Sequence, residues 1–334
     1  MIEFNKNTKK IAITGITGKT ITAWTLNDAL IRQGFNVFLS TTWNFHYNNE
    51  LLVKRKLTNP TISELMPYEE YIKKCDFFIF EATSRGISDF RIKTFCNTID
   101  VAILTHTNGF STHEEEYESR EQYLNYKSNI FSSFMLNNNG IAVFPYDTEI
   151  YENIIKILET SNVKVSNFYG FDPIEVCNLT LNALGLKENS KKVKVKGRYE
   201  KIDSNIIVDK CTQLNSVEWT LKESKEKYPN KDIVVVYPYY FNRLKNNKNK
   251  IFDFIISQDS VKKLITYEQH TQEGIPFTSP KLSIFENREM AIKEALKEDP
   301  NCLILFLGNG DQELNGETDQ EILNRLSKNK NKIK

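Results

Sequence analysis

The chain has 334 residues, enough for two ordinary domains with apolar cores. Its 44 lysines and arginines nearly balance 43 aspartates and glutamates, and the net charge of +1 argues against binding of nucleic acid or an anionic membrane through bulk charge. A hydrophobic content of 40% indicates a globular rather than a disordered protein.

The cysteines and the N-terminal segment indicate the cellular compartment in which the protein works. The five cysteines include no C-x-x-C pair and are Cys75, Cys96, Cys177, Cys211 and Cys302. This scatter favours reduced thiols over a disulfide framework or a zinc site. Nothing at the N-terminus resembles a signal peptide, and no apolar run approaches the length of a membrane span. We therefore expect a cytoplasmic protein that binds neither nucleic acid nor a membrane.

The first motif along the chain is a glycine-bearing turn at residues 12–22, Ala-Ile-Thr-Gly-Ile-Thr-Gly-Lys-Thr-Ile-Thr. It follows an apolar run and opens an amphipathic stretch, which is the strand–turn–helix context of a phosphate-binding loop. In the G-x-x-x-x-G-K-T register Ala12 replaces the first glycine, so a plain turn remains the alternative. We expect a nucleoside triphosphate here, with Lys19 at the terminal phosphate oxygens and the Thr20 hydroxyl as a magnesium ligand. The predicted phosphate-loop residues are Gly15, Thr17, Gly18, Lys19, Thr20 and Ile21.

Short apolar segments alternate with helical stretches through the first half of the chain. The predicted strands are 10–14, 36–42, 76–81, 100–105 and 140–144. This alternation predicts a mainly parallel sheet with helices on both faces. Segment 76–81 is apolar until it ends in Glu81, which is typical of a central strand whose last residue lies at the ligand-binding edge. Glu81 is therefore either a magnesium ligand or the cap of the next helix.

A basic, turn-rich segment, 189–197, interrupts the pattern and indicates the approach to a domain boundary. Beyond it, the predicted strands are 204–208, 232–238, 252–257 and 302–307, with helices at 215–227 and 287–298. We therefore predict an α/β protein with a phosphate-loop ATP-binding domain at 1–198. A smaller, Rossmann-like C-terminal α/β domain follows at 199–334.

Several separated motifs stand in an order that resembles the Mur ligase family, most of all its MurE-like branch, which adds the third amino acid to the peptidoglycan stem peptide. In the first domain they are GITGKTIT at 15–22, LTNPTISEL at 57–65, EATSRG at 81–86 with Arg91, and Thr107-Asn108 with His113, Tyr123 and Lys127. In the second they are GRYE at 197–200, Asp209, Asn287-Arg288 with Ala291-Ile292, and GNGD at 308–311.

The resemblance implies an ATP-dependent ligase that joins an amine to a carboxylate through an acyl phosphate. It implies Lys19, Lys127 and His113 as catalytic residues, and Thr20, Glu81, His113 and Lys127 as magnesium-site residues. Lys127 would act as a carbamate formed with carbon dioxide. Arg198 and Asp209 would contact ATP, and Thr58, Thr83, Ser84 and Arg91 would contact the acyl substrate.

Three of these assignments have simpler alternatives. Lysines are mostly exposed, so Lys127 taken by itself is an ordinary surface residue of a helix. His113 lies in an acidic stretch and could be a solvated loop residue. Arg198 could form a salt bridge at the domain boundary.

The sequence also departs from the family pattern. The chain begins at the phosphate loop, so we expect it to lack the N-terminal UDP-binding domain. The segments Asp209-Lys-Cys-Thr212 and Gly308-Asn-Gly-Asp311 lack the family's histidines, the second also lacks its lysine, and no D-N-P-R segment follows Phe252. The residues for phosphate, magnesium and the acyl group persist, which predicts retained chemistry on changed substrates.

The leading hypothesis is a ligase for a small peptide-like carboxylate and an amino-acid or amine acceptor, in specialised-metabolite or cell-wall-fragment biosynthesis. One alternative is a peptidoglycan-precursor ligase that depends on a protein partner for substrate recognition. Another is a regulatory protein that binds ATP without turning it over.

Overall fold

The computed structural model describes residues 2–54, 59–107, 116–195, 197–211, 213–240, 248–269 and 278–308. These form two compact units, and the chain passes from the first to the second between Val193 and Lys194. The sequence placed the boundary after residue 198. Thr58 and His113, two of the predicted site residues, lie outside the described residues.

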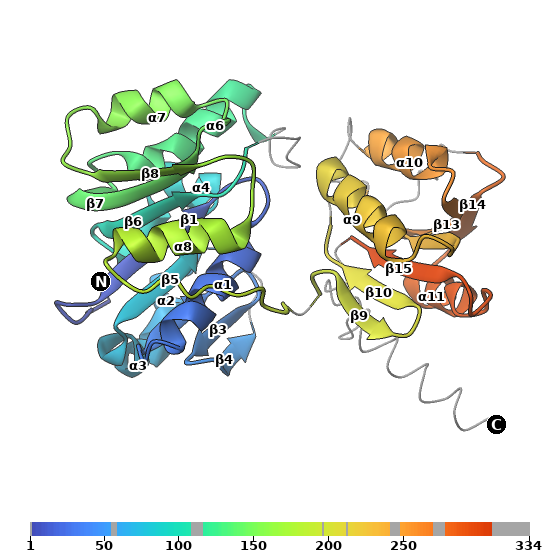
Figure 1. Ribbon diagram of the computed structural model, residues 1–334, viewed down its shortest axis with the longest axis horizontal. Coiled ribbons are helices and arrows are strands. Elements are labelled where there is room, and N and C mark those ends of the chain that lie inside the picture. Colours follow the sequence, from blue (N-terminus) through green and yellow to red (C-terminus); the bar gives the residue numbers. More distant parts are fainter. Residues whose placement is uncertain are drawn as a thin grey trace. The chain divides into compact units, whose positions relative to one another are not determined.

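The first unit contains an eight-stranded sheet in the order β4-β3-β2-β5-β1-β6-β7-β8 (Figure 1). Its parallel strands are β1 (Lys9–Thr14), β2 (Val37–Ser40), β5 (Phe77–Glu81), β6 (Ile99–Leu104), β7 (Leu136–Pro145) and β8 (Lys164–Phe168). An antiparallel hairpin, β3 (Asn44–Tyr47) and β4 (Glu50–Lys54), extends one edge. Because the other strands are parallel, their carboxyl ends meet at one edge of the sheet.

Helices cover both faces of this sheet. One face packs against α1 (Lys19–Ile31) and α8 (Pro173–Ala183). The other packs against α2 (Ile62–Leu65), α3 (Glu69–Lys74), α4 (Ser84–Ser88), α5 (Arg91–Phe95), α6 (Arg120–Ser128) and α7 (Tyr151–Leu158), with 3₁₀ turns at Met66–Tyr68 and Asn129–Phe131. In β1, Ile11 and Ile13 face the α1 side and Ala12 faces the opposite side. Alternation of buried residues on both faces identifies a central strand.

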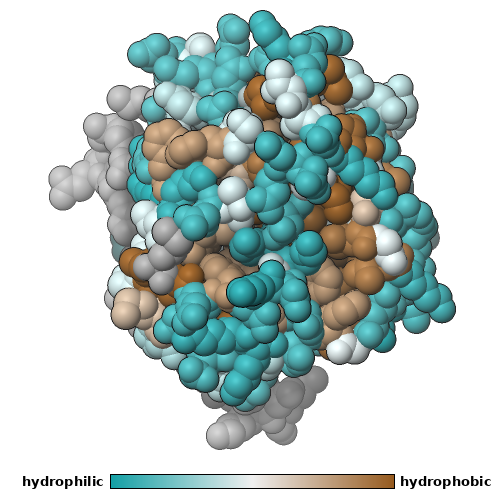
Figure 2. All heavy atoms as spheres, turned by 90° about the vertical axis from the view of Figure 1, so that its left-hand side faces the viewer, coloured by the Kyte–Doolittle hydropathy of each residue, from teal (hydrophilic) through white to brown (hydrophobic). Residues whose placement is uncertain are grey.

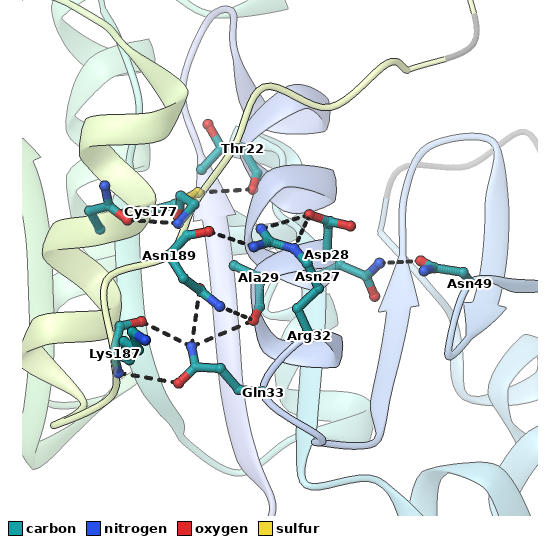
Figure 3. Close-up of polar contacts among 12 residues, drawn as sticks. Thr22, Asn27, Asp28, Ala29, Arg32, Gln33, Asn49, Cys177, Lys187 and Asn189 are labelled. Carbon is teal, nitrogen blue, oxygen red and sulfur yellow. Dashed lines mark hydrogen bonds and ion pairs between the residues drawn. The ribbon is translucent and has the colours of Figure 1, made fainter.

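The chain segment that follows α8 is tied to the end of α1 (Figure 3). The Gln33 side chain donates to the Lys187 carbonyl at 3.0 Å and accepts from the Lys187 amide at 3.2 Å. Arg32 donates to the Asn189 carbonyl at 2.7 Å and is itself held by Asp28 at 2.8 Å. The segment that leads out of the first unit is thus fixed on the helix that begins at the phosphate loop.

The second unit has a seven-stranded sheet in the order β12-β13-β11-β15-β10-β9, with β14 paired to β13. The strands are β9 (Glu200–Asp203), β10 (Ile206–Asp209), β11 (Ile233–Val236), β12 (Tyr239–Tyr240), β13 (Val261–Gln269), β14 (Leu282–Phe285) and β15 (Leu303–Leu307). All pairings are parallel except that of β9 with β10. Helices α9 (Leu214–Lys227) and α10 (Lys248–Ser257) cover one face, and α11 (Arg288–Ala295) covers the other.

One predicted element of the second unit is wrong. Residues 252–257 were expected to form a strand, but they belong to α10. The buried residues are Ile251, Phe252 and Ile255. Ile255 lies four residues after Ile251 and three after Phe252, so all three lie on one face of a helix. A short apolar run does not by itself distinguish a strand from a buried helix.

The surface of the first unit mixes polar and apolar side chains, as Figure 2 shows for the side that lies to the left in Figure 1. Apolar atoms make up more than half of an ordinary protein surface, so this mixture by itself does not indicate a partner. Among the described residues, no helix is both long enough and apolar enough to cross a membrane.

Candidate nucleotide site at the edge of the first sheet

Two glycines give the loop between β1 and α1 its shape. Gly15 has φ +143° and Gly18 has φ +83°, and both values lie in the region that favours glycine. A Cβ atom at Gly15 would lie 2.1 Å from Thr105 Oγ1, and one at Gly18 would lie 2.3 Å from the Phe171 ring. Gly18 is the N-cap of α1 and gives it no side-chain cap, so the first N–H groups of the helix suit an anionic ligand.

The end of β6 holds the loop in place. The hydroxyl of Thr105 lies 2.5 Å from the Thr17 carbonyl and 3.1 Å from the Thr14 carbonyl. The His106 carbonyl accepts from the Ile16 amide at 2.8 Å. Thr105 was not among the predicted site residues; the signal in the sequence that points to it is its place at the end of a predicted strand.

Two lysine ammonium groups converge on one carbonyl of the loop. Lys19 Nζ donates to the Gly15 carbonyl at 2.9 Å and to the Ile16 carbonyl at 3.3 Å. Lys127 Nζ, from α6, donates to the same Gly15 carbonyl at 3.2 Å and lies 4.6 Å from the centre of the Tyr123 ring. Two cations at one point of a glycine loop favour an anionic ligand there.

Lys127 is not an ordinary surface residue, because only 2% of it is exposed. Its long side chain passes over the ring of Tyr123, one helical turn earlier, and ends at the phosphate loop. Burial of a lysine carries a large desolvation cost, and such residues are rare without a partner or a function.

Glu81 is the last residue of β5 and is 1% exposed. The parallel register pairs it with Ile13, two residues before Gly15. Its Oε2 accepts from the Thr42 hydroxyl at 2.9 Å, whereas Oε1 accepts no hydrogen bond from any residue that the structure describes. An unpartnered buried carboxylate oxygen is costly unless a cation or donor meets it.

The helix-cap alternative for Glu81 is wrong. The cap of α4 is Thr83, whose hydroxyl accepts from the Gly86 amide at 3.0 Å.

The donors at this edge fit magnesium. Glu81 offers Oε1, a carboxylate oxygen with no donor in the described part of the chain, and Thr20, the second residue of α1, offers a hydroxyl. Magnesium prefers oxygen ligands, and in nucleotide sites it is bound through one or two carboxylates together with phosphate oxygens. Within the described ranges no three His, Cys, Asp or Glu side chains gather as a metal cage, which suits an ion held largely by a nucleotide.

Thr83 and Ser84, two of the predicted acyl-substrate residues, follow β5 and begin α4. The Thr83 hydroxyl donates to Asn59 Oδ1, which also accepts from the Thr83 amide at 3.1 Å. The Ser84 hydroxyl accepts from the Tyr117 hydroxyl at 2.8 Å. Asn59 and Tyr117 thus position these two side chains, a role that was not predicted from the sequence.

Arg91, the third described acyl-side candidate, lies apart from this hydrogen-bonded group. It is the first residue of α5, its side chain is half exposed, and it pairs with Asp89 at 3.0 Å. The fourth candidate, Thr58, lies outside the described residues, as does His113.

Arg198 and Asp209 belong to the second unit. Arg198 donates to the Lys210 carbonyl at 2.8 Å. Asp209, the last residue of β10, accepts from the Thr220 hydroxyl at 2.5 Å. Burial raises the pKa of the Asp209 carboxyl above its usual value, while the hydrogen bond from Thr220 and the positive charge of Arg198 act in the opposite direction.

Comparisons with known proteins agree with this architecture. The model of the Mur ligase middle domain matches residues 13–209. The chain is 36% identical over 136 residues to the UDP-N-acetylmuramoyl-L-alanyl-D-glutamate--2,6-diaminopimelate ligase of Helicobacter hepaticus. That match covers 39% of this chain and 28% of the length of the relative.

Solved structures show that the fold extends over both units. A structure of UDP-N-acetylmuramoyl-L-alanyl-D-glutamate--2,6-diaminopimelate ligase aligns with a TM-score of 0.58 at 17% identity, covering 98% of this chain and 80% of that one. The bifunctional folylpolyglutamate synthase/dihydrofolate synthase of Yersinia pestis, solved with AMPPNP and a manganese ion, aligns with a TM-score of 0.63 at 13% identity. That alignment covers 96% of this chain and 89% of that one.

The family model covers more than half of the chain, and its range contains the glycine loop, Glu81 and Lys127. The relatives that it groups are ATP-dependent ligases that form carbon–nitrogen bonds. The chain belongs to the Mur ligase middle-domain family.

Proposed function

We propose that this protein is an ATP-dependent ligase that joins an amino acid or another amine to a carboxylate on a small peptide-like molecule. The observation that carries the proposal is the buried Lys127, whose Nζ lies 3.2 Å from the Gly15 carbonyl of the phosphate loop. A protein that only binds ATP has no need of a second, buried lysine at this point. The family match and the Glu81 carboxylate support the same chemistry.

The first step is binding of ATP at the N-terminus of α1. The phosphates replace the loop carbonyls as partners of Lys19, and the N–H groups at the start of α1 donate to phosphate oxygens. Magnesium, when bound, neutralises the charge that develops on the transferred phosphoryl group. Thr20 and Glu81 would hold it through the Thr20 hydroxyl and Oε1 of Glu81, and His113 stays a predicted member of this set.

The substrate carboxylate then attacks the γ-phosphate, which gives an acyl phosphate and ADP. The amine attacks the acyl carbon, a tetrahedral intermediate forms, and inorganic phosphate leaves with the amide formed. Thr83, Ser84 and Arg91, with Thr58, are the proposed contacts of the acyl group. Arg198 and Asp209 remain proposed ATP contacts from the second unit.

Lys127 is proposed to react with carbon dioxide in its neutral amine form. The nitrogen bonds to the carbon, a proton is released, and the product is an anionic carbamate. Such a group would change a buried cation into an oxygen ligand for magnesium beside the phosphate loop. Tyr123 and the Gly15 carbonyl position the nitrogen for this change.

The proposal is tested by ADP release from the purified chain with ATP, magnesium, bicarbonate, an amino-acid pool and short carboxyl-bearing peptides. A Lys19→Ala variant serves as the control for contaminating ATPases. Release that needs both an amine and a carboxylate supports the ligase, and mass spectrometry of the mixture then identifies the product. ATP binding without release under any pairing would contradict it and favour a regulatory or partner-dependent protein.

A further inference from the structure

Two tyrosines stand at the edge of the first sheet where the phosphate loop lies. Tyr146 is the first residue after β7, and Tyr169 is the first residue after β8. Their rings are stacked, with centroids 5.1 Å apart and planes inclined by 25°. Tyr146 is 45% exposed and Tyr169 is 73% exposed. A stacked aromatic pair with this much exposed surface is a ready platform for a flat apolar ligand.

The sheet places this pair at the correct edge. Strands β1, β6, β7 and β8 are consecutive parallel neighbours, so the residues that follow them share one edge (Figure 1). β7 and β8 are the second and third neighbours of β1, which puts them roughly 10 and 14 Å away at ~4.8 Å per strand. A ribose and a chain of phosphates can bridge that separation.

A single short segment connects the pair to the phosphate loop. Phe171 lies two residues after Tyr169, and its ring occupies the space beside Gly18, where a Cβ atom would be 2.3 Å away. The same ring meets the His106 ring edge to face, with 6.3 Å between centroids. The amide of Tyr146 donates to the Phe168 carbonyl at 2.8 Å, so the ends of β7 and β8 are fixed to each other.

We propose that Tyr146 and Tyr169 form the stacking platform for the adenine base of the ATP whose phosphates bind at residues 15–20. This inference rests on the proposed function and names the part of the first unit that recognises the base. Every nucleobase has a π-face, so the platform supplies affinity for the base, and the loop supplies affinity for the phosphates.

The experiment compares ATP with inorganic tripolyphosphate, each with magnesium, by calorimetric titration of the full chain. We expect wild type to bind ATP more tightly than tripolyphosphate. Tyr146→Ala and Tyr169→Ala should weaken ATP binding by ~10- to 100-fold and leave tripolyphosphate affinity as it is. Tyr169→Phe keeps the ring, so its ATP affinity should stay close to that of wild type.

Tyr71→Ala is the matched control, because Tyr71 is also exposed and ring-paired, with Tyr47, but belongs to α3 of the same unit. It should bind both ligands as wild type does. Unchanged ATP affinity in Tyr146→Ala and Tyr169→Ala, or equal wild-type affinity for ATP and tripolyphosphate, would overturn the platform and leave the ligase intact. A wild-type chain that binds neither ligand would overturn the ligase as well.

Discussion

Each unit has a buried acid at the end of a parallel strand, and the two acids differ in their partners. Asp209 ends β10 and accepts from the Thr220 hydroxyl, and the positive charge of Arg198 also favours its charged form. Glu81 ends β5, and only Oε2 has a donor among the described residues. A buried carboxylate oxygen without a donor is costly until a cation or a donor meets it, so Glu81 is the better suited of the two acids to a metal ion. Position at a strand end alone therefore does not tell which ligand an acid can take.

The largest expected effect on ADP release comes from replacing the Glu81 carboxylate. Glu81→Gln keeps the shape of the side chain and the hydrogen bond from Thr42, and it should lower amine-dependent ADP release by about 100-fold or more. Asp100→Asn is the control, because Asp100 lies near the start of β6, at the opposite edge of the sheet, and is held by Lys10 and Asn137. Asp100→Asn should release ADP at the wild-type rate, and equal ADP release from wild type and Glu81→Gln would show that turnover does not need the Glu81 carboxylate.

The next effect concerns Lys127. Lys127→Met fills a similar volume without the amine, so we expect a folded protein that binds ATP and has lost turnover. Added bicarbonate should raise ADP release by wild type and have no effect on the variant. The measurement is ADP release with matched circular dichroism spectra. Turnover by Lys127→Met at the wild-type rate would exclude the carbamate.

A smaller effect is the pH dependence of the stability of the first unit. Burial in β3 lowers the pKa of His46 to about 4, against 6.5 in the unfolded chain. A depressed pKa on a base means that protons bind preferentially to the unfolded chain as pH falls. The first unit should therefore lose on the order of 2–3 kcal/mol of stability between pH 6.5 and 4. His46→Phe keeps a ring beside Trp24 and should remove this dependence in thermal unfolding, whereas an unchanged slope would argue against it.

The smallest expected effect is in the second unit, whose stability should decrease as pH rises. Because burial raises the folded pKa of Asp209 above 3.8, its stabilising contribution is present below that pH and decreases as pH rises through the folded pKa. Hydrogen exchange in β10 and α9 should therefore become faster, at a matched intrinsic rate, as pH rises above 3.8. Asp209→Asn should abolish the trend. A trend that persists in the variant would assign it to another group.

Parts of the site could be predicted from the sequence because they depend on local spacing. The glycine loop, the helix that begins at Lys19 and the strand that ends at Glu81 are contiguous motifs, and the structure has all three. The role of Thr105 and the link between Asn59 and Thr83 could not be predicted in this way. They join residues 24 or more positions apart, and no local pattern encodes such contacts.

The same limit explains the error at residues 252–257 and the missed tyrosine pair. A short apolar run satisfies both a strand and a buried helix, and only packing of Ile251, Phe252 and Ile255 against the second sheet selects the helix. Tyr146 and Tyr169 are 23 residues apart along the chain and come together because β7 and β8 pair in parallel.

The sequence by itself determined the α/β class, the Mur ligase resemblance and the phosphate loop, because hydrophobic periodicity and glycine positions are local properties of the chain. The tertiary structure decided which polar side chains are satisfied. It buried Lys127 against Gly15, left one oxygen of Glu81 without a described donor and gave Asp209 its partners. Whether a buried polar atom has a partner depends on the packing of distant segments, which no local pattern in the sequence encodes, and this property distinguishes Glu81 from Asp209.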